Sequence, residues 1–247
     1  MLRKYNKKSD VSYSIGVFPT IELLKNRGGD TLKVVLDPKG NRNRGVEEIK
    51  SLCKKLNVRV EDSKKSVEFL SKSGNTYAIG VFRKYNSVLK QNSNHLVLDN
   101  PSDMGNLGTI CRTMLAFGFR DLAIIKPGVD IFDPKVIRAS MGAVYKINFR
   151  YFESFNEYKE GFKRNYYPFM LSGDVLLSKS VFKIPYSLIF GNEGSGLDDS
   201  FKSIGNSVKI FQTEDVDSLN LAISVGIGLH RASLQSVPVI DAKIKNA

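Results

Sequence analysis

The sequence has few residues of the kinds that build disulfide frameworks or zinc sites. Its 247 residues include two cysteines, Cys53 and Cys111, with no short Cys-x-x-Cys spacing, and two histidines. Neither cysteine has a histidine nearby, so we expect no structural zinc and no disulfide framework. His95 and His230 have no partner at metal-ligand spacing, so we expect structural roles for both and no metal in this protein.

Long apolar runs are also missing from the sequence. No stretch approaches the ~20 apolar residues that a transmembrane helix requires. The amino-terminal segment 1–10 is basic, but no apolar run follows it as in a signal peptide. We therefore expect a soluble, cytoplasmic protein that does not enter a membrane, and two free thiols suit that reducing compartment.

Positive charge, in contrast, is abundant. The chain has 37 lysines and arginines against 25 aspartates and glutamates, a formal net charge of +12. Such an excess attracts phosphate backbones. A surface charged for solubility explains the same excess, so charge alone leaves both interpretations open. A chain of this length buries enough surface to fold without staples, as one large or two modest domains.

The first ~90 residues predict a small α/β unit, which we assign as domain 1–90, because helical and strand patterns alternate there. The helices expected in it cover 21–25 and 46–56, and the strands cover 32–36, 58–60 and 77–82. Residues 86–94 are polar and rich in Asn and Ser, which predicts a linker.

The rest of the chain, assigned as domain 95–247, alternates strand and helix patterns regularly. The strands expected in it cover 96–98, 122–125, 145–149, 169–171, 188–190 and 208–211, and the helices cover 106–117, 134–140, 154–163 and 218–235. Alternation of this kind predicts a mostly parallel sheet with flanking helices, and a ligand site at the carboxyl ends of its strands.

Three polar clusters follow predicted strands. In the first, Asn106 and Arg112 follow a strand that leads into a helix, where backbone N–H groups can face an anion. A helix cap at Asn106 and a surface ion pair at Arg112 are the simpler explanations of each residue alone. In the second, three glycines surround Glu193, with neither Walker nor dinucleotide spacing, so a plain glycine turn explains it alone.

The third cluster is Ser218-Leu-Asn220, which opens the last predicted helix. Ser218 is a natural N-cap, so capping is its default role. Asn220 in a first helical turn is less favourable than Ala or Glu, which indicates a task for its side chain.

In this order and spacing, the clusters resemble the motifs of the SpoU/TrmH-type 2′-O-ribose RNA methyltransferases of the SPOUT superfamily. The matching stretches are 101–112, 138–143, 190–197 and 218–222. The resemblance covers about residues 96–235, and the first ~90 residues are similar, more loosely, to a ribosomal-protein-like substrate-binding domain.

The resemblance implies an α/β fold with a carboxyl-terminal trefoil knot, S-adenosylmethionine as methyl donor, and a homodimer. The separate amino-terminal domain favours ribosomal over transfer RNA as the substrate. A transfer-RNA 2′-O-methyltransferase and a non-catalytic RNA-binding or ribosome-assembly protein with this fold are the alternatives. Binding alone would not require all five polar residues of the three clusters, which argues against the non-catalytic alternative. A nucleotide-binding oxidoreductase or phosphotransferase is disfavoured by the glycine spacing.

The resemblance also implies roles for the polar residues. It places Arg112 nearest the ribose hydroxyl, and since arginine keeps its proton, we expect it to bind the adjacent phosphate and stabilise alkoxide character. That phosphate or a water would then take the proton. Asn106 would orient Arg112 or the ribose, Glu193 would hold Arg112 or Asn220, and Ser218 and Asn220 would shape the loop around the ligands.

Further contacts are expected on the same grounds. The expected cofactor contacts are Gly191, Asn192, Gly194, Gly196, Ile210 and Leu219, and the expected RNA contacts are Arg3, Lys4, Arg42, Arg44 and Arg138. Two departures from the family pattern concern loops. Met104 replaces a frequent proline, and Phe211-Gln212 stand where proline and an apolar residue are common. We expect the latter pair to line the adenine pocket and to alter cofactor affinity.

Overall fold

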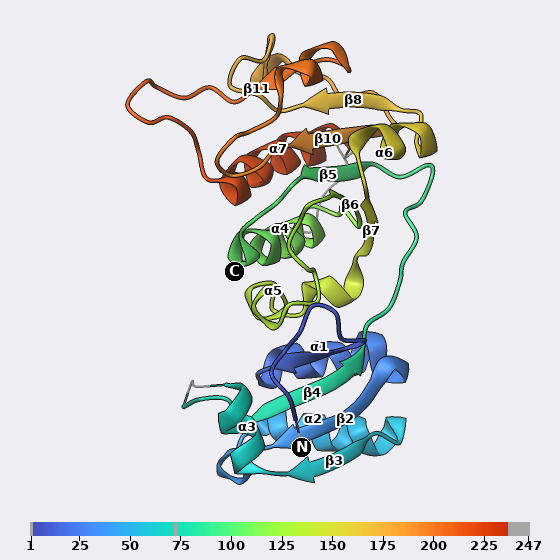
Figure 1. The fold of residues 1–247 in the computed structure, drawn as a ribbon, viewed down its shortest axis with the longest axis vertical. Coiled ribbons are helices and arrows are strands. Elements are labelled where there is room, and N and C mark those ends of the chain that lie inside the picture. The colour runs from blue at the N-terminus through green and yellow to red at the C-terminus, as the bar shows by residue number, and fades with distance from the viewer. Residues whose placement is uncertain (1, 72–73, 237–247) are drawn as a thin grey trace.

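The computed structural model describes residues 2–71 and 74–236 and contains two main sheets, one beyond the other along the long axis of the molecule (Figure 1). The first sheet has the order β1-β4-β2-β3, with β2 and β3 parallel and both contacts of β4 antiparallel. Its strands are β1 (Val11–Ile15), β2 (Thr31–Leu36), β3 (Arg59–Asp62) and β4 (Ala78–Arg83), and its helices are α1 (Val17–Arg27), α2 (Arg44–Leu56) and α3 (Lys64–Leu70), with short 3-10 turns η1 (Gly28–Asp30) and η2 (Pro38–Gly40).

Local sequence explains most of this unit. Helix α2 buries Val46, Ile49 and Cys53 on one face, and the Asn43 side chain caps it by accepting from the Gly45 N–H at 2.9 Å. The helix predicted from the same periodicity is confirmed, with two more residues at its start. Strand β1 was not predicted, because two of its five residues are serines. Both are fully buried, and one of them, Ser12, donates its hydroxyl to the Phe132 carbonyl.

The second sheet is wholly parallel, with the order β7-β6-β5-β10-β8. This confirms the predicted α/β class with a mostly parallel sheet. Its strands are β5 (His95–Asp99), β6 (Asp121–Ile125), β7 (Asn148–Phe152), β8 (Asn165–Pro168) and β10 (Tyr186–Phe190), and β9 (Val175–Leu176) pairs with β11 (Val208–Lys209) beside it. The helices are α4 (Met104–Ala116), α5 (Pro134–Ala139), α6 (Phe155–Gly161) and α7 (Leu221–Ser236), with 3-10 turns η3 (Ala143–Lys146), η4 (Leu177–Lys179) and η5 (Asp199–Ser203).

Alternate residues of each central strand enter two different apolar clusters. In β5, Leu96 and Leu98 face the cluster that includes α4, α5 and α7, whereas Val97 faces the cluster that includes α6. Because both faces are covered by helices, strands of this sheet are apolar throughout, as expected for a parallel sheet. The part of the chain described contains no helix that is both long and apolar enough to cross a membrane.

Several predicted boundaries are wrong. The strand expected at 145–149 is β7, three residues later, because Val144 and Tyr145 are buried in a 3-10 turn after Gly142, which has φ +80°. The strand expected at 169–171 is β8, which ends at Pro168. Strand β11 ends at residue 209 and α7 begins at 221, so the loop between them is longer than predicted. The predicted trefoil knot stays a prediction.

The two sheets are joined through a shared apolar contact. Leu23 and Phe82 of the first unit belong to the same buried cluster as the core of the second, and Phe82 packs edge-on against Tyr145 with ring centroids 5.6 Å apart. The predicted linker has no helix or strand, yet Leu89 in it is buried and the Ser87 hydroxyl donates to Phe149 O at 2.7 Å. The segment between the sheets is therefore held against the second unit.

Candidate functional site

Two adjacent parallel strands bring the first two polar clusters together. Strands β5 and β10 pair in register up to Leu98 and Phe190, so the loops that follow them leave the same edge of the sheet. This carboxyl edge is where parallel α/β sheets bind their ligands. The third cluster, before α7, joins this edge through side-chain contacts.

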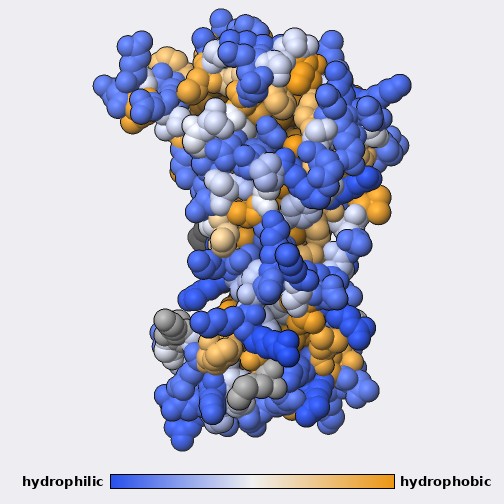
Figure 2. All heavy atoms as spheres, in the orientation of Figure 1, coloured by the Kyte–Doolittle hydropathy of each residue, from blue (hydrophilic) through white to orange (hydrophobic). Residues whose placement is uncertain are grey.

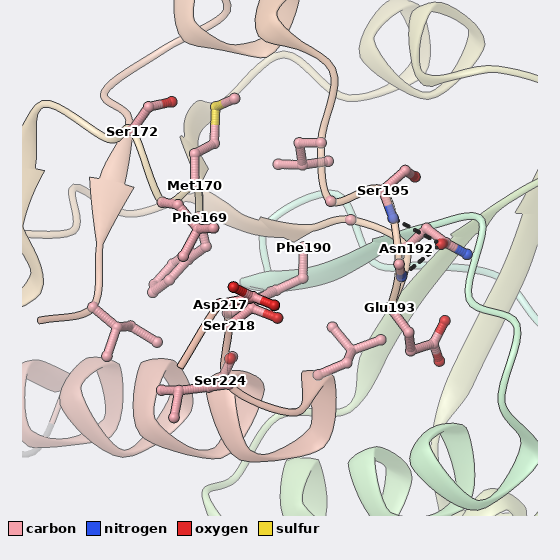
Figure 3. A pocket seen from close by; sticks show the side chains of 18 of the residues that line it. Phe169, Met170, Ser172, Phe190, Asn192, Glu193, Ser195, Asp217, Ser218 and Ser224 are labelled. Carbon is pink, nitrogen blue, oxygen red and sulfur yellow. Dashed lines mark hydrogen bonds between the residues drawn. The ribbon is translucent and has the colours of Figure 1, made fainter. Parts of the chain in front are cut away.

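The glycine-rich loop after β10 is a narrow hairpin. The Asn192 N–H donates to Gly196 O at 3.2 Å, and the Gly196 N–H donates back to Asn192 O at 3.0 Å. A Cβ at Gly191 would lie 2.1 Å from the Gly196 carbonyl carbon, so no larger residue fits there. The Asn192 side chain accepts from the Gly194 and Ser195 N–H groups (Figure 3) and donates to Asn100 O at 2.8 Å. Its amide thus holds the loop in shape.

The Glu193 carboxylate ties this loop to the start of α4. One oxygen accepts from the N–H and hydroxyl of Ser102 at 2.9 and 2.7 Å, and the other from the Asp103 N–H at 3.0 Å and from Asn106 Nδ2 at 3.2 Å. Partial burial alone would raise the pKa of Glu193, but these hydrogen bonds outweigh it, and the pKa lies below its usual range. The carboxylate is therefore ionised at neutral pH.

The same network continues to the third cluster. Asn220 Nδ2 donates to Asn106 Oδ1 at 3.0 Å, and Asn220 Oδ1 accepts from the Ala222 and Ile223 N–H groups. Three predicted site residues, Glu193, Asn106 and Asn220, are thus joined by direct hydrogen bonds although they are distant in sequence.

Neither residue considered as a helix cap, Asn106 as the simpler alternative and Ser218 by default, caps a helix in the structure. Asp103 caps α4, since its side chain accepts from the Asn106 N–H at 2.7 Å, and α4 begins at Met104. The helix after Ser218 begins three residues later, at Leu221, and Asn220 supplies the capping oxygen. Both capping residues also belong to the hydrogen-bond network: the Asp103 N–H donates to Glu193, and the Asn220 side chain donates to Asn106. These tertiary contacts set where each helix begins.

Arg112 lies apart from this network. It is exposed on α4, six residues or roughly 9 Å along the helix axis from Asn106. Its side chain forms no hydrogen bond or ion pair with any residue that the structure describes, including Asn106 and Glu193. The guanidinium is free to meet a ligand or a second chain.

A cavity of about 330 Å³ opens beside the glycine-rich loop, and we call it the cofactor cavity. All six residues expected to contact a cofactor line it, as do Glu193 and Ser218. One wall is formed by the rings of Phe169 and Phe190, stacked with centroids 4.3 Å apart (Figure 3). Gly228 of α7 permits this stack, since a Cβ there would lie within 3.0 Å of both rings. The volume of the cofactor cavity falls within the range of small-molecule sites.

The charge of this cavity differs from that of the chain. The described residues that line it include three acids, Glu193, Asp199 and Asp217, and no lysine, arginine or histidine. Asp199 contacts Lys202 at 3.5 Å. Asp217 is exposed, and among the described residues its carboxylate has no partner; Figure 3 shows it on the α7 side of the cavity. A ligand with a positive charge and an apolar or aromatic part suits such a site.

Sequence reasoning missed several of these residues. Ser102 and Asp103 precede a predicted helix, so a capping signal was present for them. Phe169 and Phe190 carried no signal beyond apolarity. Of the Phe211-Gln212 pair, Gln212 lines the cavity as expected, whereas the expectation for Phe211 is wrong: its side chain is 78% exposed and lies outside the lining.

The expected RNA contacts are all exposed and spread over three regions. Arg3 and Lys4 lie in the amino-terminal segment, Arg42 and Arg44 at the start of α2, and Arg138 on α5. No ion pair to another described residue engages any of them, so their RNA contacts remain predictions.

Both histidines contact aromatic side chains. His95 is fully buried, with Nδ1 2.9 Å from the Tyr158 hydroxyl and Nε2 2.9 Å from Lys90 O. His230 lies on α7 against the ring of Phe117. No group of three or more His, Cys, Asp or Glu residues in the described ranges is arranged to hold a metal ion.

Comparison with known proteins finds relatives that are named as RNA methyltransferases. The chain is 34% identical over 144 residues to an uncharacterized tRNA/rRNA methyltransferase of Synechocystis, covering 57% of this chain and 53% of that protein. It is 28% identical over 198 residues to the 23S rRNA (adenosine(1067)-2′-O)-methyltransferase of Streptomyces azureus, covering 74% and 72%. The chain thus spans about half the length of the first relative and more of the second.

A solved structure shares nearly the whole fold. The AdoMet-bound rRNA methyltransferase from Sinorhizobium meliloti superimposes with a TM-score of 0.79 at 25% identity, covering 93% of this chain and 89% of that one. The model of the SpoU rRNA Methylase family matches residues 93–230, more than half of the chain and all three polar clusters. This protein therefore belongs to the SpoU rRNA methylase family.

Proposed function

We propose that this protein transfers a methyl group from S-adenosylmethionine to a ribose 2′-hydroxyl of structured RNA, with ribosomal RNA as the preferred substrate. The observation that carries the proposal is the hydrogen-bonded series Glu193–Asn106–Asn220 beside the cofactor cavity. Family membership supports methyl transfer, and the name of the Streptomyces azureus relative supports ribosomal RNA and 2′-O chemistry.

The cofactor cavity fits S-adenosylmethionine in shape and charge. The Phe169–Phe190 pair offers apolar surface for an adenine ring, and main-chain groups near Gly191, Ile210 and Leu219 offer hydrogen bonds. When bound, the cofactor supplies an electrophilic methyl group on a positively charged sulfur. A cavity lined by acids and, among its described residues, by no cation suits that charge.

Arg112 is the residue we assign to the reaction itself. A ribose hydroxyl is a poor nucleophile, so catalysis requires stabilisation of the negative charge that develops on its oxygen. The free guanidinium of Arg112 would bind the neighbouring RNA phosphate and supply that stabilisation. Because arginine keeps its own proton, the hydroxyl proton passes to this phosphate or to water.

Glu193 acts, in this proposal, as a positioning residue. Its carboxylate receives four hydrogen bonds from Ser102, Asp103 and Asn106, so it holds the glycine-rich loop against the start of α4. The hydrogen bond that Asn220 donates to Asn106 connects the start of α4 to the start of α7, where Asn220 also accepts from the Ala222 N–H. Ser218, which lines the cavity without a hydrogen bond in the described chain, remains available to ligands.

We also propose that the protein is a homodimer that uses α7. Three large apolar side chains on this helix are exposed: Ile223 by 55%, Ile227 by 37% and Leu234 by 59%. With His230 between them they have the four-three-four spacing of a packed helical seam. Since α4 packs against α7, a second copy on this face would lie near the unpartnered Arg112. Sedimentation of Ile227→Asp as a monomer, with the wild type as a dimer, would support this interface.

Calorimetry and methyl transfer together test the proposed function. We expect the protein to bind S-adenosylmethionine and to transfer radiolabelled methyl groups to ribosomal RNA from a strain that lacks the gene. Mapping of 2′-O-methylation by reverse transcription at limiting nucleotide would identify the ribose. No cofactor binding by the wild type would contradict the proposal and favour a non-catalytic RNA-binding protein.

A further inference from the structure

A second cavity, of about 860 Å³, lies where the two sheet units meet, and we call it the seam cavity. Its walls come from residues 7–10, from the segment after β4, and from the loops and strand ends after β6 and β7. None of the residues assigned above to methyl transfer lines it.

The walls of the seam cavity are held together by polar contacts across the two units. Residues 2–10, which we call the amino-terminal strap, cross onto the second unit, where the Tyr5 hydroxyl donates to Asp130. Lys84 Nζ donates to Asp130 at 2.8 Å and to Lys7 O at 2.9 Å, and Lys7 Nζ donates to Gly128 O at 3.1 Å. The Lys84 and Asp130 side chains are only 16% and 12% exposed, so this wall is preformed.

The seam cavity lies at the same edge of the sheet as the methyl-transfer site. Strands β5 and β6 are parallel neighbours, and the Val129 N–H in the loop after β6 donates to Pro101 O at 3.0 Å. Pro101 directly precedes Ser102, whose hydroxyl is bound to Glu193. A chain of nucleotides with one ribose at the methyl-transfer site would therefore pass close to the seam cavity.

The lining of the seam cavity suits a nucleotide. The partly buried rings of Tyr85 and Tyr151 line it with the buried Phe132, and the Arg27 guanidinium lies 4.0 Å from the Tyr85 ring centroid, so only parts of these rings face the cavity. The exposed Asn86 amide, with no partner among the described residues, offers a donor and an acceptor. Lys126 pairs with Glu153, but the side chains are 47% and 75% exposed, so a phosphate can displace this weak pair. Unpaired RNA is recognised by such combinations of aromatic surface, amides and cations.

We propose that the seam cavity binds an unpaired nucleotide of the substrate RNA that flanks the methylated one, with the base against the rings and Asn86 and the phosphate near Lys126. This inference rests on the proposed function. The exposed residues Arg3, Lys4 and Lys8 add positive charge to the strap, whose Lys7 lines the cavity. The seam thereby gives the amino-terminal unit a part in substrate selection.

A matched pair of double variants tests this site. Asn86→Ala/Lys126→Ala removes the amide and the ammonium from the seam cavity, whereas Asn156→Ala/Lys159→Ala removes the same groups from exposed positions on α6. We expect the seam variant to bind ribosomal RNA from the deletion strain about tenfold more weakly in filter binding, with unchanged affinity for S-adenosylmethionine in calorimetry. The control should match the wild type. Equal RNA affinities for the two variants would overturn the proposal.

Photo-crosslinking of the wild type gives a second, independent measurement. With 4-thiouridine-substituted ribosomal RNA transcripts, we expect crosslinked peptides from residues 84–90 or 126–132. Crosslinks confined to other surfaces, from a protein that binds the cofactor and methylates RNA, would refute the seam site and leave the proposed function standing. A wild type that binds no S-adenosylmethionine would instead refute the proposed function, while crosslinks at the seam would still locate an RNA site.

Discussion

The cofactor cavity and the seam cavity lie at one edge of the same sheet but differ in the charge of their linings. Three acids and, among the described residues, no cation line the cofactor cavity. The seam cavity is lined by equal numbers of cations and acids, and the basic strap lies beside it; the charged lining residues are Lys7, Lys84, Lys126, Asp10, Asp130 and Glu153. In a chain of net charge +12, the cofactor cavity is acidic, whereas the charges that line the seam cavity balance, and the RNA site proposed there depends on the exposed Lys126 and the strap. The acidic lining of the first cavity, which the net charge of the chain would not predict, therefore supports the proposal of a cationic cofactor there.

The two cavities also differ in how they are built. The cofactor cavity is made by segments between residues 169 and 224 of the second unit, with glycines and backbone groups close to the ligand space. The seam cavity needs both units, since the strap reaches Asp130 across 125 residues of sequence. Hydrophilic residues cover most of the face shown in Figure 2, with smaller hydrophobic groups among them.

Replacing Arg112 should have the largest effect and should leave binding at both cavities intact. Arg112→Ala removes the charge that stabilises the ribose oxygen, so we expect the single-turnover methylation rate to fall by about 10²–10³-fold. Arg112→Lys should be similarly impaired, because a point charge does not reproduce the guanidinium fork. Cofactor affinity in calorimetry should stay within about twofold of the wild type. Retained turnover in both variants would show that Arg112 has another role.

Glu193→Ala should disturb the cofactor cavity while sparing the seam cavity. It removes the acceptor of the exposed Ser102 and Asp103 N–H groups, which water can replace, so the free energy of unfolding should fall by only about 0.5–1.5 kcal/mol. We expect methylation to fall by about 10–100-fold, with partial rescue in Glu193→Gln, which keeps one acceptor oxygen. RNA affinity in filter binding should not change. A parallel loss of RNA affinity would mean that the two cavities are coupled through α4.

Asp217→Asn tests whether the acidic lining recognises positive charge. Removing the one lining carboxylate that has no partner in the described chain should weaken S-adenosylmethionine binding about tenfold, or about 1.4 kcal/mol. S-adenosylhomocysteine, which lacks the charge on sulfur, should be affected less. Asp215→Asn changes a nearby acid of the same loop outside the cavity lining, so it is the matched control. Equal losses for both ligands would place Asp217 near the amino group instead.

Acid should destabilise the fold through the protonation of His95. Because His95 lies at the amino edge of the sheet, opposite both cavities, we expect this effect to be the same for the two sites. Burial lowers the pKa of His95 to about 4, from 6.5 in an unfolded chain. Between these values the unfolded state binds more protons, so stability is lost as pH falls from about 6.5 to about 4. The loss should approach about 3 kcal/mol. Urea unfolding across this range should show it in the wild type and a weaker dependence in His95→Gln.

Much of the second unit was predictable because its signals are local. The parallel sheet followed from alternating apolar strands and helices. Seven predicted elements of this unit agree with the structure within two residues at each end: strands β5, β6, β10 and β11 and helices α4, α5 and α6. Predictions failed where burial overrode local pattern. Ser12 and Ser14 occupy fully buried positions of β1, and Tyr145 belongs to a buried turn where a strand was expected.

The residues of the candidate site were likewise predicted where a local signal was present and missed where tertiary contacts decided. Asn106, Glu193 and Asn220 were identified from the sequence and are joined in the structure. Asp103 was overlooked as the cap of α4 because Asn106, three residues later, was an equally suitable residue type. Phe211 was assigned to the cavity by its position in the motif, but the course of the loop leaves it exposed.

By itself, the sequence determined the fold class, the polar residues of the three clusters and the glycines that allow a tight loop, because periodicity and backbone freedom are properties of neighbouring residues. Only the tertiary structure decided that Glu193, Asn106 and Asn220 form one network, that acids line one cavity, and that the strap completes another. Those features depend on contacts between segments about 90 to 125 residues apart, as in the bonds of Glu193 to Ser102 and of Tyr5 to Asp130. No local pattern encodes such contacts.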